Sequence, residues 1–112
     1  MELHQNSEIT VHELKRLVDL DYIKKIQILD IREDSERKHV SIKGTKHIKL
    51  SELASRFKEL DSDTNIFVMC HTGIRSQAAV EWLRSNGFKY AVNVLGGIDA
   101  WSALIDKKLR RY

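Results

Sequence analysis

The stretch NIFVMCHTGIRSQAAVEWLRSNG, residues 65–87, decides the fold because two kinds of hydrophobic pattern meet inside it. Residues 65–70 are a short apolar run of the kind that forms a buried strand. From Ile74 onward apolar residues recur with the period of a helix, and Gly87 is typical of a helix end. The order is therefore strand, loop and helix, and the chain's only cysteine, Cys70, lies where the strand meets the loop.

The same alternation of strand and helix continues on both sides of this stretch. Further strands are expected at residues 26–31 and 90–95, and further helices after Thr10, within 32–40, after Ser51 and over 98–105. This order predicts an α/β fold, a small parallel sheet with helices on both faces, in a single domain over residues 1–112. Ligands of such sheets bind at the carboxyl ends of strands, where Cys70 and Asp30 both lie.

The composition is that of an ordinary globular protein, with 42% hydrophobic residues, 31% charged residues and a net charge of +3. No apolar run is long enough to span a bilayer, and the opening MELHQNSEIT lacks the pattern of a leader peptide. A single cysteine cannot form an internal disulfide, which favours a reducing, cytoplasmic setting without a membrane partner. The five histidines show no metal-ligand spacing, and we expect neither a metal nor another cofactor.

Much of the basic excess lies in the tail KKLRRY, residues 107–112. A solvated surface and the attraction of an anion or an acidic partner both fit this excess. No interleaved aromatic and basic residues accompany it, so we expect no nucleic-acid partner. The sequence leaves the role of the tail and the oligomeric state open.

The loop after residue 70 has the ingredients of an anion-binding cradle. The first turn of the following helix leaves backbone N–H groups without partners, and the helix dipole adds positive potential there. Gly73 permits a backbone conformation that other residues resist, and Arg75 adds a permanent cation. A thiol in this cradle is expected to be partly thiolate and nucleophilic at neutral pH. The alternative is that Cys70 is a small buried core residue.

The spacing of Cys70 and Arg75 separates two kinds of cysteine chemistry. Cysteine phosphatases place the arginine one residue further on, where this chain has Ser76. The shorter loop makes a tighter cradle, which suits a terminal sulfur on the cysteine better than a tetrahedral phosphate or arsenate. Loop length therefore disfavours a phosphatase or an arsenate reductase.

Three motifs in order resemble the single-domain rhodanese family of sulfurtransferases. CHTGIRS (70–76) resembles the active-site loop, and DIREDSE (30–36) resembles the Asp-x-Arg-Glu segment. LRSNGFKYAVNVLGGIDAW (83–101) resembles the C-terminal signature. The resemblance implies the rhodanese fold and transfer of sulfur through a cysteine persulfide. The donor would be a small anion such as thiosulfate or a persulfide, and the acceptor a thiol, cyanide or a protein.

Carried onto this chain, the resemblance makes Cys70 the nucleophile. The substrate-binding cradle would be His71, Thr72, Gly73, Ile74 and Arg75, and the supporting residues would be Asp30, Arg32 and Ser76. We interpret Asp30 and Arg32 as a structural ion-pair network, with Arg32–Glu36 as one expected pair, and Trp101 as a core anchor.

One segment departs from the family pattern. The family often has Gly-His-Ile-Pro-Gly where this chain reads VSIKG (40–44), which we interpret as support for the fold. Two further hypotheses remain beside a sulfurtransferase: a rhodanese-fold binding or regulatory module, and a sulfur carrier in a relay that receives sulfur from a protein donor.

Overall fold

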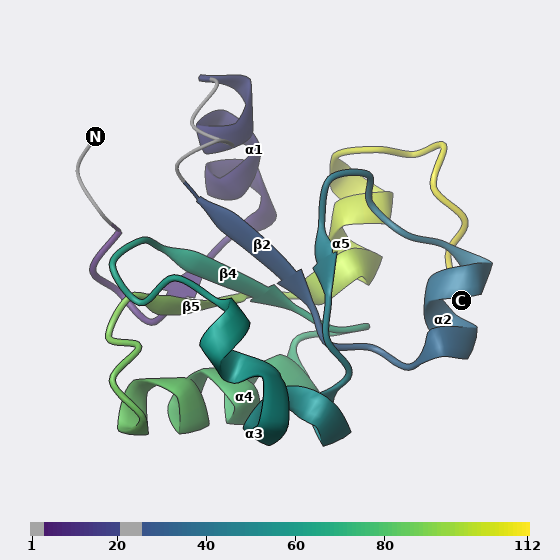
Figure 1. Cartoon of the computed structure of the whole chain (residues 1–112). Coiled ribbons are helices and arrows are strands. Elements are labelled where there is room, and N and C mark those ends of the chain that lie inside the picture. Colours follow the sequence, from purple (N-terminus) through teal and green to yellow (C-terminus); the bar gives the residue numbers. More distant parts are fainter. Residues whose placement is uncertain (1–3, 21–25) are drawn as a thin grey trace.

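The computed structural model, which describes residues 4–20 and 26–112, contains a five-stranded, wholly parallel sheet (Figure 1). The strands lie in the order β1-β5-β4-β2-β3. Their bounds are Glu8–Ile9 for β1, Gln27–Asp30 for β2, Lys46–His47 for β3, Ile66–Met69 for β4 and Ala91–Val94 for β5. The strand that leads to Cys70, β4, is therefore the central one.

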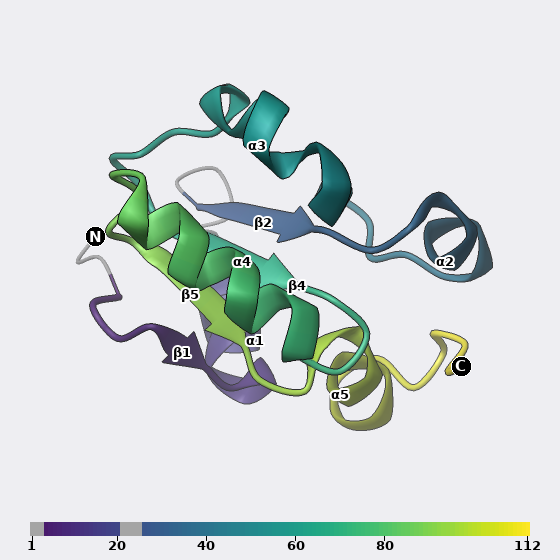
Figure 2. The same ribbon diagram turned by 90° about the horizontal axis from the view of Figure 1, so that it is seen from below.

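Helices cover both faces of this sheet, as the sequence predicts. Their bounds are Val11–Asp19 for α1, Asp34–His39 for α2, Leu53–Arg56 for α3, Ile74–Ser85 for α4 and Gly97–Leu104 for α5. Figures 1 and 2 show α1 and α5 on one face, α3 and α4 on the other, and α2 beyond the carboxyl end of β2. The α/β fold class is thus confirmed.

β4 contributes side chains to both halves of the core. Ile66 and Val68 belong to the apolar cluster under α3 and α4, whereas Phe67 and Met69 belong to the cluster under α1 and α5. All four are buried, because successive side chains of a strand alternate between faces that are both covered. Trp101 of α5 is buried in the second cluster, which confirms its expected role in the core.

Two local features differ from the sequence-based expectation. The two-residue edge strands β1 and β3 were not foreseen. The helix expected to follow Ser51 instead begins at Leu50, one residue before Ser51. It starts as a 3₁₀ turn over Leu50–Glu52 and continues into α3. The VSIKG segment forms the connection between α2 and β3, with Lys43 exposed.

Two expectations concern the whole chain. The single domain over 1–112 stays a prediction, and residues 1–3 of the stretch examined for a leader lie outside the described part. Within residues 4–20 and 26–112, no helix is both long enough and apolar enough to cross a membrane.

Candidate active site

The loop from Cys70 to Gly73 connects the central strand to α4 and is fixed by the start of α5. The amide of Ile98 donates to the carbonyl oxygen of Cys70 at 2.9 Å, and the amide of Asp99 donates to that of His71 at 3.0 Å. These donors are the free N–H groups of the first turn of α5. The loop that follows β4 is therefore held by the first turn of α5, the helix that follows β5.

The sulfur of Cys70 lies inside the turn that begins α4. The amide of Gly73 donates to Sγ at 3.1 Å and the amide of Ser76 donates to it at 3.4 Å. Gly73 has a φ of +99°, in the left-handed region that the sequence analysis expected a glycine to occupy. Cys70 itself is 1% exposed, so a reactant must reach the sulfur through the loop.

These contacts determine the acidity of the thiol. Burial raises the pKa of Cys70, but the Ser76 hydroxyl and the backbone N–H groups of Ser76, Gly73 and Thr72 favour the thiolate and lower it. The net pKa is below the ordinary value of a thiol. This direction agrees with the expected thiolate, and it is opposite to that of an inert cysteine buried among apolar groups.

Asn93 of β5 connects the end of the cysteine loop, at Gly73, to Ser76 in the first turn of α4. Its Nδ2 donates to the carbonyl oxygen of Gly73 at 3.2 Å, and its Oδ1 accepts the hydroxyl hydrogen of Ser76. The Ser76 Oγ also lies 3.3 Å from the Cys70 Sγ. All these groups are buried, so the single hydroxyl hydrogen of Ser76 has two competing acceptors, the amide oxygen and the sulfur.

Ser76→Ala is expected to raise the pKa of Cys70, because the thiolate loses the hydroxyl while the two amide donors remain. The ultraviolet absorbance of the thiolate against pH measures this, and alkylation at neutral pH is expected to slow a few-fold. Ser85→Ala is the matched control, since its hydroxyl serves only the Glu81 carbonyl at the far end of α4. An unchanged Cys70 pKa in Ser76→Ala would show that the hydroxyl serves Asn93 alone.

Asp30 and Arg32 form a buried ion pair, in line with their structural interpretation. Arg32 Nη2 lies 2.8 Å from Asp30 Oδ2, and Arg32 Nε also donates to this carboxylate. Arg37 reaches the same carboxylate at 3.0 Å. Arg32 further donates to the carbonyl oxygen of Val40, which ties β2 to the end of α2. The pair lies beside the site without contacting the sulfur.

The prediction that Arg32 pairs with the Glu36 carboxylate was wrong. Arg32 reaches only the backbone oxygen of Glu36, at 3.3 Å, because its other nitrogens are committed to Asp30 and Val40. The Glu36 carboxylate instead binds Arg75 in a two-pronged ion pair of 2.7 and 2.8 Å. Hydrogen bonds from Arg75 hold the pKa of Glu36 at about 2, so the pair is charged throughout the neutral range.

Tyr112 lies over this group of charges. Its hydroxyl donates to Glu36 Oε2 at 2.7 Å and accepts from Arg32 Nη1 at 3.0 Å. Its ring stacks on the His71 imidazole, with ring centres 3.9 Å apart and planes at 8°. The Nε2 of His71 is buried and has no hydrogen-bond partner among residues 4–20 and 26–112.

The residues proposed from sequence converge on the sulfur in two ways. Gly73 and Ser76 contact it through the backbone, while the side chains of Thr72 and Ile74 face solvent. Arg75 and His71 form what we call the rim of the cysteine loop. Arg75 is bound there by Glu36, and His71 is stacked on Tyr112. Sequence reasoning missed Asn93 and Tyr112, and it paired Glu36 with Arg32 instead of Arg75. Asn93 had a usable signal, a polar residue inside an apolar strand, whereas the tail of Tyr112 has no periodic pattern.

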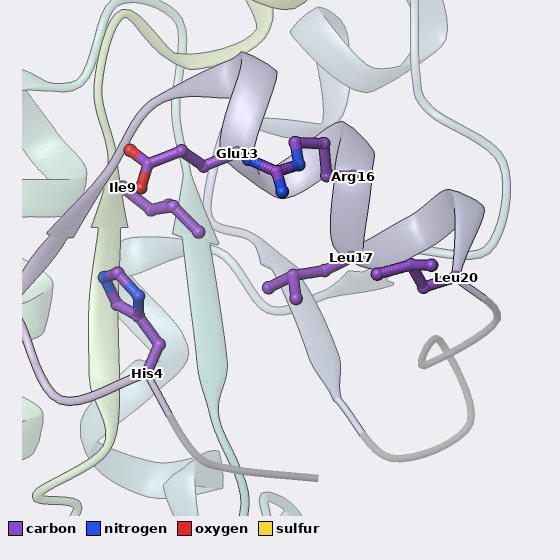
Figure 3. A pocket seen from close by; sticks show the side chains of 6 residues that line it. All are labelled: His4, Ile9, Glu13, Arg16, Leu17 and Leu20. Atoms are coloured by element: carbon purple, nitrogen blue, oxygen red, sulfur yellow. The ribbon is translucent and has the colours of Figure 1, made fainter.

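A separate hollow lies between β1 and α1, away from the cysteine loop (Figure 3). Its lining residues are His4, Ile9, Glu13, Arg16, Leu17 and Leu20. The Glu13 carboxylate there is engaged in the cap of α1, where it accepts from the amide and the hydroxyl of Thr10. No residue of the cysteine loop lines this hollow, so it is separate from the candidate active site.

Comparison with known proteins identifies the family of this domain. The model of the family described as Rhodanese-like domain matches residues 10–104. The crystal structure of a rhodanese-like domain protein from Staphylococcus aureus superposes with a TM-score of 0.79 at 33% identity, over 96% of this chain and 99% of that one.

Two curated relatives carry functional names. "Putative sulfur carrier protein YrkF" of Bacillus subtilis is 37% identical over 95 residues, 85% of this chain. "Thiosulfate sulfurtransferase GlpE" of Shewanella oneidensis is 32% identical over 88 residues, 79% of this chain and 87% of that protein. The matched part is only 50% of the Bacillus protein, so this chain corresponds to one part of that relative.

Proposed function

Because this chain belongs to the rhodanese-like domain family, we propose that it transfers sulfane sulfur as a persulfide on Cys70. Its relatives include proteins named as sulfurtransferases and as sulfur carriers. The observation that carries the proposal is the position of the Cys70 sulfur, which accepts hydrogen bonds from two amides at the start of α4. Such donors stabilise a thiolate and would equally stabilise an anionic sulfur attached to it.

The first half-reaction forms the persulfide. The Cys70 thiolate attacks the outer sulfur of thiosulfate, the sulfur–sulfur bond of thiosulfate breaks, and sulfite leaves with the bonding electron pair. A hydropersulfide donor, R–S–SH, reacts in the same way: its sulfur–sulfur bond breaks, and R–S⁻ leaves with the bonding electron pair. The proton of the outer sulfur passes to R–S⁻, which departs as the thiol R–SH. The product, Cys70–S–S⁻, places its terminal sulfur toward the cradle that Gly73 and Ser76 form.

The second half-reaction returns the enzyme to its starting state. An acceptor thiolate or cyanide attacks the outer sulfur, and Cys70 leaves as the thiolate that the amides stabilise. The chain has one cysteine, so it holds no second thiol to resolve the persulfide. Turnover therefore requires an external acceptor, either a small molecule or a thiol on another protein.

The intact mass of the purified protein tests this proposal. Incubation with thiosulfate or with a hydropersulfide is expected to add one sulfur atom, and cyanide is expected to remove it as thiocyanate. Retention of the original mass with both donors, and also with a cysteine desulfurase that offers a protein persulfide, would contradict the proposal. The chain would then serve as a binding or regulatory module of this fold.

A sulfur carrier is the second candidate, and the enclosure of the site favours it. Cys70 is 1% exposed, and both terminal nitrogens of Arg75 are already bound by Glu36. A protein donor could supply its own contacts at the rim and would depend less on a free arginine. Faster loading by a cysteine desulfurase than by thiosulfate, at equal donor concentration, would select the carrier role.

Arg75→Ala is expected to lower kcat/KM for thiosulfate by about tenfold or more, because a dianion loses a charged hydrogen-bond donor. The variant also leaves the Glu36 carboxylate unpaired near the donor, which adds repulsion. A hydropersulfide such as that of N-acetylcysteamine, which has no sulfonate group and carries at most one negative charge, should be affected far less. Arg75→Lys, which keeps the charge, is the matched control. An equal loss with both donors would show that Arg75 supports the loop rather than the anion.

A further inference from the structure

The rim of the cysteine loop is neutralised by residues of the chain itself. Arg75, the cation nearest the loop, is bound through both terminal nitrogens by Glu36. The Glu36 carboxylate also accepts the hydroxyl of Tyr112. A two-pronged arginine–carboxylate contact is among the stronger polar pairs, since both partners are charged and their geometries match. An incoming anion must therefore compete with the Glu36 carboxylate for the charge of Arg75.

The second group at the rim is covered as well. The His71 imidazole is stacked beneath the Tyr112 ring, and its Nε2 is buried without a partner. A buried ring nitrogen without a hydrogen bond is unfavourable. This nitrogen would gain a partner if the tyrosine ring moved aside and admitted water or a donor oxygen. The Tyr112 ring thus covers His71 and keeps its Nε2 away from a hydrogen-bond partner.

The tail reaches this position by a fixed route. After α5 it packs Leu109 against the core cluster beneath α1 and α5, and Arg111 pairs with Asp99 at 3.0 Å. Figure 1 shows the yellow tail running from α5 to α2. There the Tyr112 ring reaches His71 of the cysteine loop. Edge contact with His39 of α2 completes the seat of the Tyr112 ring.

We propose that Tyr112 and Glu36 are specificity-determining residues that disfavour small dianionic donors such as thiosulfate and favour donors whose sulfur is carried on an organic thiol. The inference rests on the proposed function. A thiosulfate dianion depends on Arg75 and on the polar rim, where Glu36 and Tyr112 already make contacts. A hydropersulfide reacts when its outer sulfur meets the Cys70 thiolate, and its departing thiolate needs no sulfonate site.

The test compares two donors in single-turnover experiments that follow the mass of the Cys70 persulfide. The donors are thiosulfate, a dianion, and the hydropersulfide of N-acetylcysteamine, which has no sulfonate group and carries at most one negative charge. The variants are Tyr112→Ala, Tyr112→Phe and Glu36→Gln. Lys108→Ala is the control, because it lies in the same tail and is exposed. The measured quantity is the ratio of the two second-order rate constants, thiosulfate over hydropersulfide.

Tyr112→Ala and Glu36→Gln are each expected to raise this ratio about tenfold, while Lys108→Ala leaves it unchanged. Tyr112→Phe, which loses the hydroxyl and keeps the ring over His71, is expected to fall between the wild type and Tyr112→Ala. Equal acceleration with both donors would show a simple steric cover and overturn the inference. A lower ratio in Glu36→Gln would overturn it too, because Glu36 would then be orienting Arg75 for thiosulfate.

Failure of the inference can be told apart from failure of the proposed function. Persulfide formation with either donor, at an unchanged ratio in all variants, leaves the function standing and removes the role of Tyr112 and Glu36. No persulfide in any variant with either donor, nor with a cysteine desulfurase, contradicts both.

Discussion

Cys70→Ser is expected to abolish the gain of sulfur with every donor, because a serine hydroxyl stays protonated at neutral pH in a cradle that only lowers the pKa of a thiol. The substitution replaces sulfur by oxygen and keeps the amide donors of Gly73 and Ser76 in place. The fold should therefore survive. The measurement is intact mass after incubation with donor and again after cyanide.

The control for this variant is a second substitution at the same position. Cys70→Ala removes the polar atom altogether and should likewise gain no sulfur, with an unfolding transition close to that of Cys70→Ser. Sulfur retained by either variant and released by cyanide would place the reactive group elsewhere. Since the chain has no other cysteine, such a result would contradict persulfide chemistry at this site.

Gly97→Ala is expected to lower the free energy of unfolding and to disrupt the site at the same time. A Cβ on Gly97 would overlap the carbonyl oxygen of Cys70 and lie 2.7 Å from that of His71. Both are backbone atoms, so the cysteine loop or the start of α5 must shift. Overpacking of this kind is unfavourable by about 1–3 kcal/mol. The shift should also weaken the bonds from Ile98 and Asp99 that hold the loop.

Gly87→Ala separates this effect from ordinary backbone strain. Gly87 also has a positive φ, of +90°, but a Cβ there would meet nothing within 4 Å. Chemical denaturation should show Gly97→Ala less stable than Gly87→Ala by about 1–3 kcal/mol, and only Gly97→Ala should slow persulfide formation. Equal stabilities would mean that the two loops adapt to the added methyl group without strain.

The central part of this architecture could be predicted because its signals are local. An apolar run covered on both faces, a glycine at a left-handed position and a periodic helix identify β4, Gly73 and α4 from adjacent residues. The edge strands β1 and β3 could not be found in this way. Each has only two residues, too few for a periodic pattern, and each exists because a neighbouring strand offers hydrogen-bonding partners.

The rim of the site could not be predicted because its contacts are long-range. Spacing suggested Arg32 and Glu36 as partners, but Asp30 is closer to Arg32 and leaves Glu36 to Arg75, 39 positions along the chain. Tyr112 reaches Glu36 across 76 positions. Nothing in the amino-acid order around these residues specifies such pairs, which depend on how the loops meet at the carboxyl edge of the sheet.

Because β4 is the central strand, the backbone that leads to Cys70 is expected to resist hydrogen exchange more strongly than the rim residues do. β4 is bonded on one side to β5 and on the other to β2, and its backbone exchanges with solvent only through the rarest opening of the sheet. Tyr112 is held by side-chain contacts at a surface-exposed end of the fold, where opening is frequent. The rim can therefore open and close many times while the strand that carries Cys70 stays in place.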